Sequence, residues 1–212
     1  MATGLLGGSF NPAHRGHRRI SLFAMDALGL AETWWLVSPG NPLKPRAGMA
    51  PLSARLASAA RMARRAPIRA TAIEQRLGTR YTADTLAALV RRFPARRFIW
   101  LMGADNLAQF HRWRQWRRIA RTVPIAVVGR PGYDADAHRA PAMGWLRRAV
   151  RPQTQARRWT CWRLPAIVLL RLPPDPTSAT AIRQRDPDWH LAPHNRAPRD
   201  SVTRRPLPQE IS

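Results

Sequence analysis

The chain has 212 residues, 45% of them hydrophobic and 23% charged, which is typical of a globular domain and excludes a wholly disordered or fibrous protein. No apolar run approaches the ~20 residues that a membrane-spanning helix needs, and the N-terminus lacks the basic and apolar segments of a secretory signal, so we expect neither a membrane span nor export. The formal net charge of +24, from 36 basic and 12 acidic residues, makes nucleic acid a candidate partner.

Short apolar runs alternate with longer amphipathic segments, which is the pattern of βαβ units around a mostly parallel sheet. The predicted strands are Thr3–Gly7, Thr33–Val37, Ile68–Ile73, Phe98–Met102, Pro124–Val128 and Ala166–Arg171. The predicted helices are Ile20–Leu28, which Gly29 ends, Ala54–Arg65, and Thr82–Phe93, with Thr82 as N-cap and Pro94 as the stop. The sequence therefore predicts an α/β fold with helices on both faces of the sheet.

The composition changes near residue 186. Residues 187–212 are rich in Pro, Arg and Asp, and the prolines exclude a long helix. Few large apolar side chains follow Leu191, so this stretch buries too little surface to offset the entropy of ordering it. We expect a domain over 1–186 and an irregular or disordered basic tail over 187–212, whose removal after Leu191 leaves activity nearly unchanged. The alternative is a tail that folds over the active site or binds a partner chain.

The cysteine and lysine counts indicate the redox environment of the protein and the kind of partner that it binds. Cys161 is the only cysteine, so the chain forms no internal disulfide and has no cysteine-rich zinc site, which favours a reducing cytoplasm. Lys44 is the only lysine, and the 35 arginines are scattered along the chain instead of forming one basic stripe with interleaved aromatic residues. The nearest approach to such a stripe is the segment 111–118. Nucleic acid is therefore an unlikely partner and stays an alternative.

The first predicted strand leads directly into a turn that contains glycine and histidine, residues 7–17. Gly7 and Gly8 would let the backbone approach a ligand, and the helix start that follows favours a phosphate. His14 and His17 can face the same side of the first helical turn. Two imidazoles are too few for a zinc site, so we predict phosphate contact and no protein-held metal. A tight βα turn with locally bonded histidines is the simpler alternative.

Two further segments carry groups suited to phosphate. Lys44 follows the second predicted strand in a Pro-Gly-Asn-Pro loop, where a flexible ammonium approaches a phosphate differently from a guanidinium. Ser178, Thr180 and Arg183 lie where a helix would begin after the last strand. Chance placement of the lysine and ordinary helix capping by Ser178 are the simpler alternatives.

Together these segments carry a resemblance to a known family. Gly7-Gly8-Ser9-Phe10-Asn11-Pro12 with His14-Arg15-Gly16-His17 resembles the HxGH signature of the nucleotidyltransferase superfamily. Five later segments, in family order, resemble bacterial nicotinate-mononucleotide adenylyltransferase: Asn41-Pro42-Leu43-Lys44, Tyr81-Thr82-Ala83-Asp84-Thr85, Gly103-Ala104-Asp105 with Trp113, Arg130-Pro131-Gly132, and Ser178-Ala179-Thr180-Ala181-Ile182-Arg183. The similarity covers roughly residues 3–186.

The resemblance implies a Rossmann-like, doubly wound fold with the site at the carboxyl ends of the strands. It implies transfer of AMP from ATP to nicotinate mononucleotide, with Mg2+ carried by the ATP. The catalytic residues would be His14, His17, Lys44 and Arg183, and the ATP-binding residues Gly7, Gly8, Ser9, Phe10, Ser178 and Thr180. The mononucleotide would contact Thr82, Thr85, Asp105, Trp113 and Arg130, whereas Trp116 would be a packing residue.

One position departs from the family pattern, and two motifs separate the family from its nearest enzymatic alternative. Ala179 stands where the family often has a second serine, which removes one hydroxyl contact. Pantetheine-phosphate adenylyltransferase shares the HxGH signature but lacks the Tyr-Thr-x-Asp-Thr segment and the pairing of Asp105 with Trp113. It is the nearest enzymatic alternative, and a basic nucleic-acid-binding α/β protein is the alternative outside enzymology.

Overall fold

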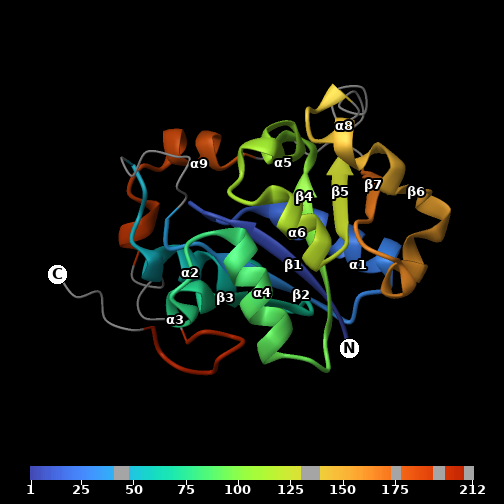
Figure 1. Cartoon of the computed structure of the whole chain (residues 1–212). Helices are drawn as coiled ribbons and strands as arrows, with labels where there is room; N and C mark the ends of the chain where they lie inside the picture. Colours follow the sequence, from blue (N-terminus) through green and yellow to red (C-terminus); the bar gives the residue numbers. More distant parts are fainter. Residues whose placement is uncertain (41–47, 130–138, 173–177, 193–198, 208–212) are drawn as a thin grey trace.

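The computed structural model describes residues 1–40, 48–129, 139–172, 178–192 and 199–207. Its centre is a seven-stranded sheet in the order β3-β2-β1-β4-β5-β7-β6, and neighbouring strands run parallel (Figure 1). The strands are β1 (Ala2–Gly8), β2 (Glu32–Val37), β3 (Ile68–Thr71), β4 (Arg97–Gly103), β5 (Ile125–Gly129), β6 (Val150–Arg151) and β7 (Ile167–Arg171). The strand order reverses between β1 and β4, and α/β sheets bind ligands at such a switch point.

All six predicted strands are confirmed, and so is the parallel α/β fold. The structure adds β6, which at two residues is too short to leave a pattern in the sequence. It also ends β3 at Thr71, two residues earlier than predicted. The reason is local, because the Thr71 hydroxyl accepts a hydrogen bond from Ile73 N at 3.1 Å and so turns the chain into a helix.

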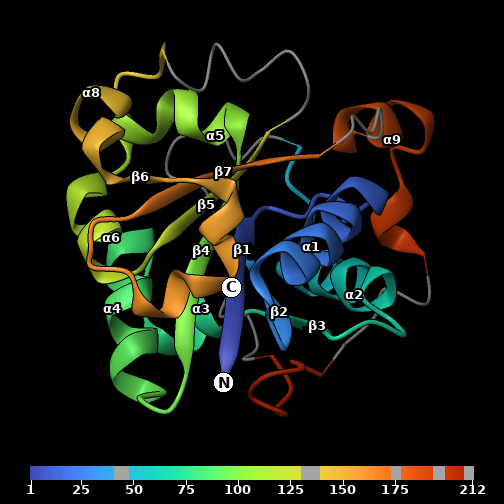
Figure 2. The same ribbon diagram turned by 90° about the vertical axis from the view of Figure 1, so that its right-hand side faces the viewer.

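Helices cover both faces of the sheet. The α-helices are α1 (Arg15–Leu28), α2 (Leu52–Met62), α3 (Ile73–Leu77), α4 (Thr82–Arg92), α5 (Ala104–Gln109), α6 (Trp116–Thr122), α8 (Met143–Leu146) and α9 (Ala179–Arg185). The 3-10 segments are η1 (Phe110–Arg112), η2 (Arg147–Ala149), η3 (Gln153–Cys161) and η4 (Trp189–Leu191). Figure 2 shows α1 and α2 on one side of the sheet and α4 and α6 on the other. None of the helices in the described part of the chain is long and apolar enough to cross a membrane.

The two faces have separate hydrophobic cores because successive strand residues point to opposite sides. Leu5 and Trp34 pack with the core of α4, α5 and α6, whereas their neighbours Leu6 and Trp35 pack with the core of α1, α2 and η3. The sheet is therefore buried on both sides, which explains why its strands read as continuous apolar runs.

The helix ends agree with the sequence signals in part. Gly29 ends α1 in the left-handed conformation, with φ of 63°, as predicted. Thr82 is the first residue of α4, and Tyr81 occupies the N-cap without a side-chain hydrogen bond. The prediction of Thr82 as N-cap is therefore wrong by one position. Helix α2 ends at Met62, three residues before the predicted end.

Part of the basic tail is ordered against the sheet. Residues 199–207 lie beside β3, and Arg199 and Pro206 form an isolated antiparallel bridge. Asp200 is only 1% exposed. A buried carboxylate thus supplies the anchoring of this irregular segment that apolar side chains do not. The division into a domain over 1–186 and a tail over 187–212 stays a prediction.

Candidate functional site

The turn after β1 arranges two imidazoles at the start of α1. His14 is the N-cap, and its Nδ1 accepts a hydrogen bond from Gly16 N at 3.2 Å. His17 Nδ1 accepts from His14 N, also at 3.2 Å, which completes a capping box. Because both Nδ1 atoms are acceptors, the proton of each neutral ring lies on Nε2. The two rings therefore carry N–H donors on the side away from the backbone.

His17 is held neutral by its surroundings. Its ring centroid lies 3.9 Å from that of His14 and 4.7 Å from that of Phe10. Burial, together with the repulsion that the protonated forms of His14 and His17 would exert on each other, lowers the pKa of His17 to about 3. At neutral pH His17 is thus an uncharged donor through Nε2. The predicted placement of the two histidines on one side of the first turn is confirmed by the closeness of their rings, and both histidines also take part in the helix cap.

The glycines and Phe10 of this turn have packing roles that the sequence did not indicate. A Cβ at Gly7 would lie 2.5 Å from the Trp100 ring, and one at Gly8 would lie 3.3 Å from the Phe10 ring. Phe10 has a φ of 47°, is 1% exposed, and stacks on Trp35 at 5.1 Å. The structure therefore places the Phe10 ring in the core. Only the backbone of Phe10 is left to contact a nucleotide.

No sequence pattern indicates Arg55, a buried arginine of α2 that ties the loops at this edge together. Its guanidinium donates to four backbone carbonyls, those of Ala50 (2.8 Å), Ser9 (2.8 Å), Ser38 (2.6 Å) and Pro39 (3.3 Å). Arg55 is 2% exposed. Among 35 arginines nothing in the sequence singles it out. It joins the end of β1 to the end of β2, so it fixes the turn that carries the histidines.

The structure brings the segment 178–183 to the histidine turn. Ser178 is the N-cap of α9, and its hydroxyl accepts from Ala181 N at 3.1 Å. Arg183 donates to the carbonyl of Asn11 at 2.6 Å and to the Thr180 hydroxyl at 3.3 Å. Ordinary capping by Ser178 is thus present, yet Arg183 also joins two motifs that lie 172 positions apart.

Asp105 and Trp113 both follow β4 at the carboxyl edge. Asp105 is exposed in the first turn of α5. Trp113 is half-buried and packs edge-on against Trp100 at 6.2 Å and Phe110 at 5.5 Å. Trp116 packs against Phe110 and Trp145, so its predicted packing role is confirmed.

Thr85 lies in a different setting from the one expected. Its side chain is fully buried, and its hydroxyl donates to Glu74 Oε1 at 3.0 Å and lies 2.9 Å from the Thr79 hydroxyl. Direct contact between this hydroxyl and a ligand is therefore not what the geometry favours. Burial raises the pKa of Glu74 to about 7, against the hydrogen bonds from Thr85 and Ser38 that lower it. Thr82, three residues before Thr85, is half-buried at the start of α4.

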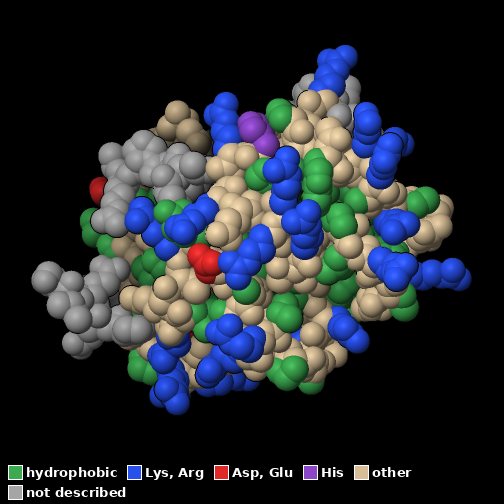
Figure 3. Space-filling view, in the orientation of Figure 1, with side chains coloured by type: hydrophobic (Ala, Val, Ile, Leu, Met, Phe, Trp, Pro, Cys, Tyr) green, Lys and Arg blue, Asp and Glu red, His purple; other side chains and the backbone are tan. Residues whose placement is uncertain are grey.

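Two predicted residues, Lys44 and Arg130, lie outside the described residues. Within the described ranges no group of three or more His, Cys, Asp or Glu side chains could hold a metal ion. Figure 3 shows arginines spread over the visible face instead of gathered in one stripe. The donors that the structure does bring to the carboxyl edge are the neutral ring of His17 and the guanidinium of Arg183, and both are suited to phosphates.

Comparison with known proteins identifies relatives over most of the chain. The cytidylyltransferase-like family model matches residues 5–185. A probable nicotinate-nucleotide adenylyltransferase of Erythrobacter litoralis is 65% identical over 89% of this chain and 86% of its own length. One of Parvibaculum lavamentivorans is 54% identical over 90% and 94%. The fold resembles that of Plasmodium falciparum nicotinic acid mononucleotide adenylyltransferase complexed with NaAD, with a TM-score of 0.64, 14% identity, and coverage of 86% and 82%.

Proposed function

Because the chain belongs to the nicotinate-nucleotide adenylyltransferases of the cytidylyltransferase-like family, we propose that its carboxyl edge transfers AMP from ATP to nicotinate mononucleotide. The observation that carries the proposal is the hydrogen bond from Arg183 to Asn11. It joins the histidine turn to the segment 178–183, so two sequence motifs suited to phosphate form one site.

The reaction is an in-line displacement at the α-phosphorus of ATP. A phosphate oxygen of the mononucleotide forms the new P–O bond, and the bond to pyrophosphate breaks with its electron pair going to the leaving group. No protein nucleophile takes part, so the protein positions two anions and offsets the charge that develops. His14 and His17 serve this purpose through their Nε2–H donors, and Arg183 adds a guanidinium at the same turn.

The other predicted residues divide between the two substrates. We place the ATP at the backbone of Gly7, Gly8, Ser9 and Phe10 and at the hydroxyls of Ser178 and Thr180. Lys44 is assigned to phosphate contact by its motif alone, and Arg130 to the mononucleotide on the same ground. Trp113 would stack on the pyridine ring while Asp105 accepts hydrogen bonds from a ribose.

Mg2+ enters this proposal with the ATP. Since the described residues contain no cluster of three metal ligands, phosphate oxygens and water would supply most of its coordination, which is the usual mode for this ion. When bound, Mg2+ offsets negative charge on the phosphates. We place the reaction in the cytoplasm, where the exposed free thiol of Cys161 would stay reduced.

The test is a pyrophosphate-release assay with ATP and Mg2+ against three acceptors. Nicotinate mononucleotide should be the preferred acceptor over nicotinamide mononucleotide and phosphopantetheine. Preference for phosphopantetheine would overturn the proposal and indicate a pantetheine-phosphate adenylyltransferase. Tight binding to nucleic acid that weakens steeply with salt, without pyrophosphate release, would support the non-enzymatic alternative.

A further inference from the structure

One carboxylate anchors the segment 199–207 to the sheet. Asp200 is buried, and its two oxygens accept four hydrogen bonds. One oxygen accepts from the end of β3, from Thr71 Oγ1 at 2.7 Å and Ala72 N at 2.8 Å. The other accepts from the tail itself, from Val202 N at 2.9 Å and Thr203 N at 2.8 Å. Asp200 thus fixes the tail and the end of β3 to each other.

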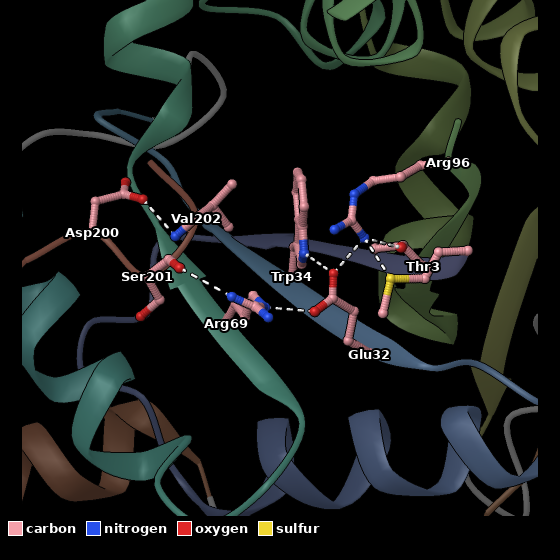
Figure 4. Close-up of polar contacts among 9 residues, drawn as sticks. Thr3, Glu32, Trp34, Arg69, Arg96, Asp200, Ser201 and Val202 are labelled. Carbon is pink, nitrogen blue, oxygen red and sulfur yellow. Dashed lines mark hydrogen bonds and ion pairs between the residues drawn. The ribbon is translucent and has the colours of Figure 1, made fainter. Parts of the chain in front are cut away.

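The same segment covers an edge of the sheet. β3 is the terminal strand of the sheet, so within the described part of the chain one side of its backbone has no neighbouring strand. Ser201 N donates to the carbonyl of Ala70 at 3.0 Å, and Arg69 donates to the carbonyl of Ser201 at 3.5 Å (Figure 4). Farther along, Arg76 of α3 donates to the carbonyl of Pro206 at 2.6 Å. The tail is therefore seated on β3 and α3 by polar contacts with backbone and side chains.

A path of hydrogen bonds continues from Asp200 to the first turn of α4. The Thr71 hydroxyl that donates to Asp200 also accepts from Ile73 N, the first residue of α3. Glu74 follows, and its carboxylate accepts from the Thr85 hydroxyl at 3.0 Å. Thr85 belongs to the first turn of α4, which begins at Thr82. The position of this turn thus depends on the turn between β3 and α3.

We propose that Asp200 is a positioning residue for the nicotinate mononucleotide, because it holds the turn between β3 and α3 and thereby the first turn of α4. The inference rests on the proposed function and on the resemblance, which assigns Thr82, the first residue of α4, to that substrate. The histidine turn on the ATP side has anchors of its own, Arg55 and Arg183, and its one link to the Asp200 path is Ser38, which bonds Glu74 and whose carbonyl Arg55 also holds. Loss of Asp200 therefore acts on one substrate and leaves the other nearly unchanged.

The test compares Michaelis constants for the two substrates in four variants of the full chain. Asp200→Asn, which must lose acceptor capacity toward one pair of donors, and Thr71→Val should each raise KM for nicotinate mononucleotide about tenfold while KM for ATP changes less than about twofold. Thr71→Ser keeps the hydroxyl, and Arg205→Ala removes an exposed side chain of the same segment. Both controls should resemble the wild type.

A double-mutant cycle tests whether the effect passes through Glu74. Glu74→Leu removes the acceptor, and Thr85 keeps its contact with Thr79. In the Glu74→Leu background, Asp200→Asn should change KM for the mononucleotide by less than about twofold. If Asp200→Asn fails to fold, Thr71→Val against Thr71→Ser carries the test, since the pair differs chiefly in one hydroxyl.

The outcomes separate the two proposals. A wild-type chain that does not adenylate nicotinate mononucleotide overturns the proposed function. A wild-type chain that does so, with variants that lose thermal stability but show equal changes in both Michaelis constants, overturns the positioning role of Asp200 alone. Additive effects of Asp200→Asn and Glu74→Leu also overturn it.

Discussion

Two buried glutamates at opposite ends of the sheet have opposite environments. At the amino end, Glu32 on β2 accepts from Arg69, Arg96 and the Trp34 indole (Figure 4). Burial raises its pKa, but the bonds from Arg69 and Trp34 and the charges of both arginines leave it below the usual value. At the carboxyl end, Glu74 has hydroxyl partners and its pKa rises to about 7.

The difference separates a stabilising end from a functional end. The Glu32 cluster is closed, because its donors are used within the protein. The carboxyl edge instead places the neutral ring of His17 and the guanidinium of Arg183 at one turn. We expect substitutions at the amino end to change the free energy of unfolding, and substitutions at the carboxyl end to change catalysis or the pH dependence of stability.

The largest effect is expected from Arg96→Ala. The variant removes one cation from a buried carboxylate and also the contact of that arginine with the Thr3 hydroxyl. Breaking a buried ion pair costs roughly 3–5 kcal/mol, and a value near the lower limit is expected because Arg69 still pairs with Glu32. Urea unfolding measures the loss. Turnover at urea concentrations below the unfolding transition should stay near the wild-type value. A large fall in kcat would contradict the purely stabilising role of the Glu32 cluster.

A second prediction concerns the pH dependence of stability through Glu74. Its folded pKa of about 7 exceeds the ordinary value of 4.5, so the folded state retains a proton that the unfolded state has lost between these values. Stability from this group is present below pH 4.5 and falls as pH rises toward 7, by on the order of 3 kcal/mol in total.

The measurement is the difference in unfolding free energy between wild type and Glu74→Gln across pH. His17 has the reverse sign, because its lowered pKa of about 3 makes stability rise with pH up to its ordinary value of 6.5. The two slopes oppose each other in the wild type, and Glu74→Gln should expose the rise due to His17. A pH-independent difference between the two proteins would remove Glu74 as a titrating group.

A third prediction addresses the histidines directly. His17→Ala should lower turnover ~10²-fold or more, and His14→Ala somewhat less, because each removes a donor aimed at charge in the transition state. Thermal unfolding should change much less than for Arg96→Ala. Steady-state kinetics with both substrates saturating is the measurement, and near-normal turnover in either variant would exclude that histidine from the mechanism.

The smallest effect is expected for Trp113→Ala. Stacking is a contact with one substrate in its ground state, so KM for nicotinate mononucleotide should rise about tenfold and KM for ATP much less. Trp116→Ala is the matched control. Trp116 packs on Trp145, and the motif that contains Asp105 does not assign it to the substrate. Equal changes in both Michaelis constants for Trp113→Ala would indicate a packing role only.

The sequence by itself determined the sheet and the histidine turn, because both depend on local patterns. Apolar runs of strand length, and the spacing of His14 and His17 next to glycine, are readable without knowing what packs where. The resemblance to nucleotidyltransferases also rests on motifs in chain order, and the comparisons confirm the family.

Tertiary structure alone decided how distant residues are used. In the sequence Arg55 is one of 35 arginines, and only the fold surrounds it with backbone carbonyls. The sequence predicts Thr85 as a ligand donor, whereas in the fold its hydroxyl donates to Glu74. Asp200 lies in a stretch whose composition predicts disorder, and only the fold brings two donors at the end of β3 to its carboxylate. The physical reason is that burial and hydrogen-bond partners are properties of the folded neighbourhood, which no local pattern contains.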